Sequence, residues 1–427
     1  MTTRTTGGVL LVGLFLLFLL TADYGAQSID TVASATPAWH LAVHGTPWLE
    51  GVLPPNPWYV VGSHGHLASN RFPGTVLLAV PFYWLMRSPT GVHVPAFPAA
   101  VCAALVTAGA MTALFATLAR LHGHRLALGA TLVLALATPT WSVSGAALWT
   151  HGPAQLCFAL ALLACARERS PSPWLGFAVL VRPQLVVVGG VMMCHQVLRR
   201  DLRAARSTAA GLALGAMSFL LWNRWLYGRW SIHGGYDLSP YHDGHPLGGM
   251  PTLPLGLFSP ERGLVVLSPF LLLLLPGLRA AWRECPWWCR SAALGGAASF
   301  ILTVFLVDAQ GGDSFYGYRH PLESLVLATP LLVRSFELTV ARSAVRLQAF
   351  TLLVAVSAAL ISVGAVFYVP TSTTYDPWTT LDAAVLVQQH GLLPVLSVGA
   401  TAAAATLAAG VALGLRSAGR KRQFAVA

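Results

Sequence analysis

The stretch LALGATLVLALATPTWSVSGAALWTHGPAQLCFALALLACA occupies residues 126–166 and contains no Asp, Glu, Lys or Arg. A helix needs about 20 apolar residues to cross the hydrocarbon core of a bilayer, so this run is long enough to cross twice. Such a run predicts a membrane protein and excludes a soluble fold.

Uncharged runs recur along the whole chain, at 5–22, 88–119, 207–223, 263–278, 291–307, 347–375 and 383–415. Shorter apolar segments lie at 75–86, 173–198 and 322–333. Hydrophobic residues make up 55% of the chain, charged residues 10%, and the mean hydropathy is +0.64. We therefore predict an all-α fold, a polytopic transmembrane bundle of about 11 to 13 helices in which residues 1–427 form one domain.

The first apolar run can be interpreted as a membrane helix or as a signal peptide. Arg4 precedes it and small residues follow near Thr21, which is also the pattern of a secretory signal peptide. Because the rest of the chain is equally apolar, we favour an uncleaved first helix.

Basic residues give the orientation. They cluster at Arg199–Arg206, Arg279–Arg290, Arg334–Arg346 and Arg416–Arg422, and the positive-inside rule places such clusters in the cytoplasm, with both termini. Loops at about 23–73, 228–262, 308–321 and 369–387 then face outward, hold most of the acidic residues and carry short interfacial helices. The net charge of +11 thus reports anchoring to the anionic lipid of a plasma membrane and not nucleic-acid binding.

One region resists simple alternation of crossings. Strict alternation would place Arg120–Arg125 and Arg167–Arg169 outside the membrane, against the positive-inside rule. The conflict disappears if residues 171–198, which Arg182 and Pro183 interrupt, form a hairpin of two short helices, and if one crossing before Arg120 is added or removed. The number of crossings between 75 and 198 stays open.

The first outer loop carries the sharpest signal. Asp30 closely follows the first helix, an amphipathic stretch with Trp39, His40 and His44 comes next, and SNRFPG at 69–74 leads back to the next apolar segment. Further motifs follow in order: ALWTH at 147–151, LVRP at 180–183, NRWLYG at 223–228, FSPERGLVVLSP at 258–269 and GGDSFYGYRHPLE at 311–323.

This order of motifs resembles the GT-C superfamily of integral membrane glycosyltransferases, which take sugars from polyprenyl-phosphate carriers. The resemblance spans about 300 residues and implies a GT-C-like fold, an extracytoplasmic active site and an inverting transfer. The donor would be a polyprenyl-phosphate-linked sugar, and the acceptor a glycan, a glycolipid or a protein. The motifs do not distinguish between donor sugars.

The resemblance implies that Asp30 is the catalytic base, since the essential acid of the family lies soon after the first helix. Asp30 as the N-cap of a helix starting at Thr31 is the alternative, and a cap stabilises by about 1 kcal/mol. Glu50 is a second candidate for the base.

Four arginines are candidate ligands of the donor phosphate, because a guanidinium binds phosphate through two hydrogen bonds. Arg319 lies where the third outer loop returns to the membrane, and the alternative is an interfacial side chain that snorkels to water. Arg182 interrupts an apolar stretch and must face protein, water or a partner, or else lie in a hairpin turn at the interface. Arg71 and Arg262 complete the set.

Further substrate contacts are predicted at His44, His151, Tyr236, Tyr318 and His320. Packing without a substrate contact is the alternative for His151. The second outer loop also holds a weak metal-site candidate at Asp237, His242, Asp243 and His245, whose side chains are plausible ligands of a divalent cation such as Mg²⁺ or Mn²⁺. No HExxH motif accompanies these residues. We therefore favour the interpretation that they belong to a loop that covers the substrate or to a solvated loop.

Two other classes of protein stay as alternatives. A sugar-lipid or lipid transporter would show paired repeats and intramembrane charges, of which Arg182 is a single example. A non-catalytic membrane scaffold would use the outer loops to bind partners only.

Overall fold

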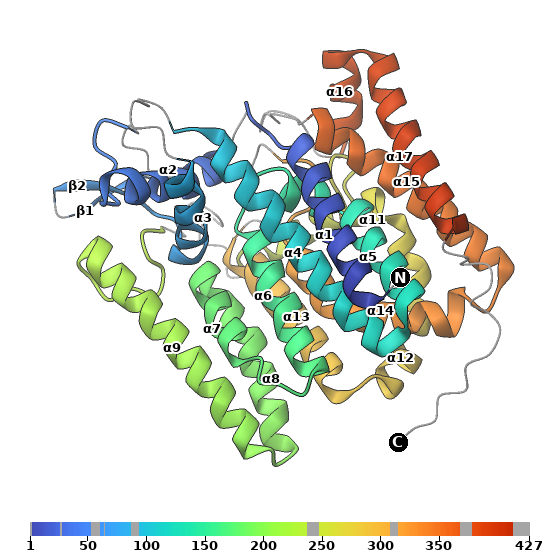
Figure 1. Ribbon diagram of the computed structural model, residues 1–427, viewed down its shortest axis with the longest axis horizontal. Coiled ribbons are helices and arrows are strands. Elements are labelled where there is room, and N and C mark those ends of the chain that lie inside the picture. The colour runs from blue at the N-terminus through green and yellow to red at the C-terminus, as the bar shows by residue number, and fades with distance from the viewer. Residues whose placement is uncertain are drawn as a thin grey trace.

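The computed structural model describes residues 2–25, 28–52, 60–63, 65–86, 94–236, 247–307, 315–367 and 378–412. Helices dominate this part of the chain, and its one strand pair is the antiparallel hairpin of β1 (Val60–Ser63) and β2 (His66–Ser69). Figure 1 shows the helices gathered in one bundle, with the β hairpin projecting at the left beside α2 and α3. The predicted all-α membrane fold is confirmed.

The helices follow the apolar runs of the sequence. Their bounds are α1 Thr3–Leu20, α2 Ile29–His44, α3 Pro73–Leu85, α4 Ala96–His122, α5 His124–Leu136, α6 His151–Ala166, α7 Ser172–Val181, α8 Val186–Leu198, α9 Leu202–Tyr227, α10 Leu253–Phe258, α11 Leu264–Leu267, α12 Leu278–Glu284, α13 Trp287–Leu306, α14 Leu322–Ser335, α15 Ala344–Phe367, α16 Asp382–His390 and α17 Leu392–Ala412. Single turns and short non-α helices join them at Thr140–Gly145, Pro183–Leu185, Met250–Thr252, Pro269–Gly277 and Phe336–Val340.

Within the described residues, six helices are long and apolar enough to cross a membrane, namely α1, α4, α9, α13, α15 and α17. Shorter apolar helices, α3 and α5 to α8, lie among them. The predicted bundle therefore contains both full-length and short helices.

Basic residues of α4, α5 and α14 lie together at one end of this bundle. Thr6 at the start of α1 bonds His124 at the start of α5, with 3.0 Å between Oγ1 and Nε2. Nδ1 of His122, at the end of α4, lies 3.0 Å from the Glu337 carboxylate. The same carboxylate accepts a 2.8 Å hydrogen bond from Arg334, near the end of α14. We call this the basic end, and the opposite end, where Asp30 lies, the site end.

Helix α3 does not cross the bundle. It begins at the site end, where Gly74 packs directly on the backbone of Val181, and its Tyr83 hydroxyl donates to the carbonyl of Pro95, just before α4 begins. One crossing fewer lets α4 run from the site end to the basic end. Arg120–Arg125 then lies with the other basic clusters, which resolves the conflict in the predicted topology.

Helices α7 and α8 form the predicted hairpin. Both pack against the same level of α9: a Cβ atom at Gly176 would lie 2.4 Å from the carbonyl oxygen of Gly211, and one at Gly189 would lie 2.5 Å from Leu212. Only glycine at Gly176 permits this approach of α7 to α9. The turn between α7 and α8 holds Arg182, whose hydrogen bond to Glu323 at the start of α14 places it at the site end.

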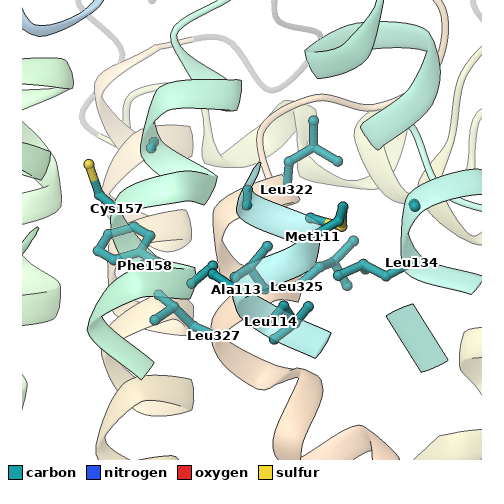
Figure 2. Close-up of a cluster of buried hydrophobic side chains, with 14 of the residues drawn as sticks. Met111, Ala113, Leu114, Leu134, Cys157, Phe158, Leu322, Leu325 and Leu327 are labelled. Atoms are coloured by element: carbon teal, nitrogen blue, oxygen red, sulfur yellow. The ribbon is translucent and has the colours of Figure 1, made fainter. Parts of the chain in front are cut away.

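The main hydrophobic core surrounds α4. Figure 2 shows Met111, Ala113 and Leu114 of α4 gathered with Cys157 and Phe158 of α6, Leu322, Leu325 and Leu327 of α14, and Leu134 of α5. Alternation of alanine with larger side chains allows α4 and α6 to approach closely. This packing fixes α14, and with it the Arg319 loop that precedes α14.

Candidate functional site

One carboxylate meets two guanidinium groups at the site end. The two carboxylate oxygens of Asp30, in the first turn of α2, are bound separately: Oδ1 by Arg71, and Oδ2 by Arg319 over a distance of 2.7 Å. Arg71 is 41 residues and Arg319 289 residues further along the chain. The fold therefore assembles this cluster from three distant segments.

Asp30 is not the cap of its helix. The N-cap residue of α2 is Ser28, whose hydroxyl accepts from the backbone N–H of Asp30. The capping alternative for Asp30 is wrong, because its side chain is committed to the two arginines. About a third of that side chain, 32%, stays exposed, so a substrate can reach it.

Arg71 is held by the β hairpin that precedes it. The hydroxyl of Ser69, the last residue of β2, donates to the carbonyl of Ala33 in α2 over 2.6 Å and accepts from the backbone N–H of Arg71. The hairpin is thereby fixed to α2. The buried guanidinium of Arg71 also donates to the hydroxyl of Tyr236, and its carbon atom lies 4.9 Å from the centre of that ring.

Arg319 packs against two aromatic rings that contact each other. Its guanidinium carbon is 4.3 Å from the centre of the Trp149 ring and 4.7 Å from that of Phe315. The preceding Gly317 has φ +90°, and a Cβ atom there would lie 2.7 Å from Pro139, so this turn requires glycine. With 12% of its side chain exposed, Arg319 does not snorkel to water, and that alternative is wrong.

Opposing effects act on the Asp30 carboxyl. Burial raises its pKa, whereas the positive charges of Arg71 and Arg319 lower it, and the net result lies well below the usual value. Asp30 is therefore ionised at neutral pH. While both arginines are bound to it, however, it is a weak base.

A second cluster lies buried beside the first. Glu323, at the start of α14, accepts a 2.8 Å hydrogen bond from Arg182 and lies 2.9 Å from Nδ1 of His151, and all three side chains are buried. His151 is close enough for its charge to act on Asp30. Both interpretations of Arg182 made from the sequence therefore hold: it lies at a hairpin turn, and its charge is paired with Glu323.

Sequence reasoning did not assign Glu323 a role. It ends the motif GGDSFYGYRHPLE, four residues after Arg319, and is an acid at the edge of an apolar helix. A buried acid of this kind needs a partner charge. That requirement was the available signal for pairing Glu323 with Arg182.

Arg262 contacts the same aromatic ring as Arg319. Its guanidinium carbon is 4.7 Å from the centre of the Phe315 ring, which it shares with Arg319, and it is paired with the neighbouring Glu261. Both side chains of this pair are buried. All four predicted arginines therefore lie around the same end of α14.

The other predicted contacts divide into two groups. Tyr318 and His320 are buried beside the arginines, with ring centres 5.7 Å apart. Glu50 is instead paired with His66 at an exposed rim, 2.8 Å between carboxylate and Nδ1, and His44 packs against Trp39 at the far end of α2. The structure does not bring Glu50 or His44 to Asp30.

The predicted metal-site residues Asp237, His242, Asp243 and His245 lie outside the described residues. Within the described part of the chain, no group of three or more His, Cys, Asp or Glu residues is arranged to hold a metal ion.

Two solved structures share this architecture, both crystal structures of ArnT from Cupriavidus metallidurans. The one bound to undecaprenyl phosphate has 15% sequence identity and a TM-score of 0.56, covering 97% of this chain and 77% of that chain. The apo structure has 17% identity and a TM-score of 0.54, covering 98% and 78%. No protein-family model matches the chain, and no curated protein sequence matches it. The predicted GT-C-like fold is confirmed by this similarity.

Proposed function

We propose that the protein is a membrane glycosyltransferase that moves a sugar from a polyprenyl-phosphate carrier to an extracytoplasmic acceptor with inversion. The observation that carries the proposal is the convergence of Arg71 and Arg319 on Asp30. A transferase of this kind needs cations for the leaving phosphate and a base for the acceptor hydroxyl, and the cluster supplies both. The neighbour bound to undecaprenyl phosphate, which has the same fold, supports this class of donor.

In the proposed reaction, the acceptor hydroxyl attacks the anomeric carbon of the donor sugar from the face opposite the phosphate. Asp30 takes the hydroxyl proton as the new C–O bond forms. The bond from the anomeric carbon to the phosphate oxygen breaks, and its electron pair leaves with the polyprenyl phosphate. Arg319 and Arg71 bind that phosphate, while Arg182 and Arg262, paired with Glu323 and Glu261, border the site.

The same arginines make the base dependent on the donor. A phosphate entering the site competes with Asp30 for Arg71 and Arg319. As their hydrogen bonds turn to phosphate, the pKa of Asp30 rises toward its usual value, so the carboxylate becomes a stronger base when the donor is in place. Turnover in EDTA measures whether a divalent cation such as Mg²⁺ or Mn²⁺ contributes further charge.

The proposed sidedness follows from the basic residues. The basic end, with Arg120–Arg125 and Arg334, faces the cytoplasm of a plasma-membrane protein, and the site end faces outward. Both termini are then cytoplasmic. The acceptor is a glycan, a glycolipid or a protein at the outer face.

The test is sugar transfer by the purified full-length protein in lipid nanodiscs, with a panel of undecaprenyl-phosphate sugars as donors. Asp30→Ala is expected to lower turnover by about 100-fold or more, the usual contribution of a general base. Asp201→Asn, at the opposite end of the bundle, is the matched control and retains turnover. Equal rates for Asp30→Ala and the wild type, in protein that folds equally well, would overturn the proposal.

A further inference from the structure

A cavity of about 70 Å³ lies in the half of the bundle nearest the basic end. Its walls come from α5, α14, α15 and the two short non-α helices Pro269–Gly277 and Phe336–Val340. Neither of these short helices repeats at 3.6 residues per turn, so their side chains do not interlock with the ridges of an α-helix, and a space is left. Among the described residues that line the cavity, Thr329 alone has a polar side chain, and its hydroxyl donates to the carbonyl of Leu325 in its own helix over 2.6 Å.

The cavity opens toward lipid. Ala130 of its α5 wall is half-buried, and the adjoining Leu272 and Leu275 are 46% and 53% exposed, as expected of side chains that face hydrocarbon. The lining residues of α5 run from Leu126, in its first turn, to Leu134. At 1.5 Å per residue this is a length of about 12 Å, within one leaflet of a hydrocarbon core that is about 30 Å thick. That leaflet is the one at the basic end, where α5 begins.

Two arginines lie at the basic-end edge of the cavity. Arg125 precedes the lining residue Gly129 by one helical turn in α5, and Arg346 precedes the lining residue Phe350 by one turn in α15. Residues four apart share a helix face, and helical side chains lean toward the N-terminus. For both helices that terminus is at the basic end, and the two helices contact each other. Both arginines are exposed, and within the described part of the chain neither forms an ion pair.

We propose that the cavity holds an acyl chain of an anionic phospholipid from the leaflet at the basic end, and that the phosphate of this lipid binds Arg125 and Arg346. An apolar cavity stays free of water and takes up apolar groups, and this one has room for several methylene groups. Guanidinium groups at a membrane surface attract anionic lipid and bind its phosphate. The chemistry of the cavity and the charge at its edge therefore point to the same molecule.

This lipid site is separate from the proposed donor site. The phosphate of a polyprenyl donor would bind Arg71 and Arg319 at the site end, whereas Arg125 and Arg346 lie at the basic end. One phosphate cannot reach both pairs. An acyl chain in the cavity would fill the space between α5, α14 and α15, and would stabilise the packing of α14, which follows the Arg319 loop.

The test is lipid binding to the full-length protein, washed free of lipid in a neutral detergent and titrated with single lipids under native mass spectrometry. The probes are dioleoyl phosphatidylglycerol, which is anionic, and dioleoyl phosphatidylcholine, which is zwitterionic. Arg125→Ala and Arg346→Ala should each weaken the binding of phosphatidylglycerol about 5-fold, the usual effect of one basic residue at an anionic surface. The double variant should bind phosphatidylglycerol no more tightly than phosphatidylcholine.

The matched control removes the same charge elsewhere at the basic end. Arg203→Ala combined with Arg206→Ala lies in α9, which contributes no described residue to the cavity wall, and should leave the affinity unchanged. Equal weakening by the control pair and by the Arg125 and Arg346 pair would show general attraction of lipid to the basic end and overturn the proposal. Equal affinity of the wild type for the two lipids would also overturn it.

The cavity is tested by filling it. Ala130→Phe keeps both arginines and should lower the affinity for dioleoyl phosphatidylglycerol to that of the dihexanoyl form, whose chains are too short to fill the cavity. If Ala130→Phe does not fold, the wild type decides the point, because equal affinities for the dioleoyl and dihexanoyl lipids overturn the proposal. Undecaprenyl phosphate tests the other source of an apolar chain. Its affinity should be the same in Ala130→Phe and the wild type; a loss of undecaprenyl phosphate with unchanged phosphatidylglycerol binding would assign the cavity to the donor's tail and overturn the proposal.

Discussion

Glu323→Ala tests the buried charge cluster beside Asp30. In the wild type the Arg182 guanidinium lies 2.8 Å from the Glu323 carboxylate. The substitution leaves this guanidinium buried without a carboxylate partner and also removes the partner of His151. Breaking a buried ion pair by deleting one member costs about 3 to 5 kcal/mol, because the other charge stays unpaired. We expect Glu323→Ala to lose that much of the free energy of unfolding.

The assay is equilibrium unfolding in mixed micelles with increasing denaturing detergent. The matched variant is Glu323→Met combined with Arg182→Met, which removes both charges and keeps the volume. That pair should unfold close to the wild type, since replacing both charges by apolar groups is often neutral. If Glu323→Ala is as stable as the wild type, or if the double variant is the less stable of the two, the reasoning about this pair is refuted.

Three further predictions concern the site and its frame. Arg319→Lys should lower transfer by about tenfold or more in initial-rate assays, because lysine lacks the planar group that packs against two rings and binds phosphate through two hydrogen bonds. An unchanged rate would contradict this. The ion pairs of Asp30 are fully formed above its usual pKa and are lost as pH falls through its lowered pKa. The pH profile of kcat/KM should therefore show no change due to Asp30 between about pH 5 and 8. A fall in kcat/KM near pH 6 that Asp30→Asn abolishes would contradict this prediction. Gly215→Ala would place a Cβ atom 2.2 Å from the carbonyl oxygen of Gly176 and should reduce the yield of folded protein, whereas Gly190→Ala, with open space around it, should not, as size-exclusion profiles would show.

Much of the fold could be predicted from apolar length alone. The runs at 126–166 and 207–223 give helices because a bilayer leaves the backbone no other partner for its hydrogen bonds. Length could not decide whether residues 75–86 cross. Helix α3 is as apolar as a spanning helix, but Pro95 and Val181 hold both its ends at the site end.

The candidate site was predictable residue by residue but not as a set. Asp30 could be named because the motifs resemble a family whose essential acid lies soon after the first helix, and Arg71 and Arg319 because they lie where outer loops return to the membrane. Their mutual contacts depend on the packing of α2, the β hairpin and α14.

The most direct measurement of the central claim is the affinity of Asp30→Asn for undecaprenyl phosphate, taken together with its rate of sugar transfer. If the arginines serve the phosphate and the carboxylate serves the acceptor, this variant frees Arg71 and Arg319. It should then bind the lipid phosphate at least as tightly as the wild type while transferring sugar about 100-fold more slowly or worse. Weakened lipid binding with transfer at the wild-type rate would contradict the account.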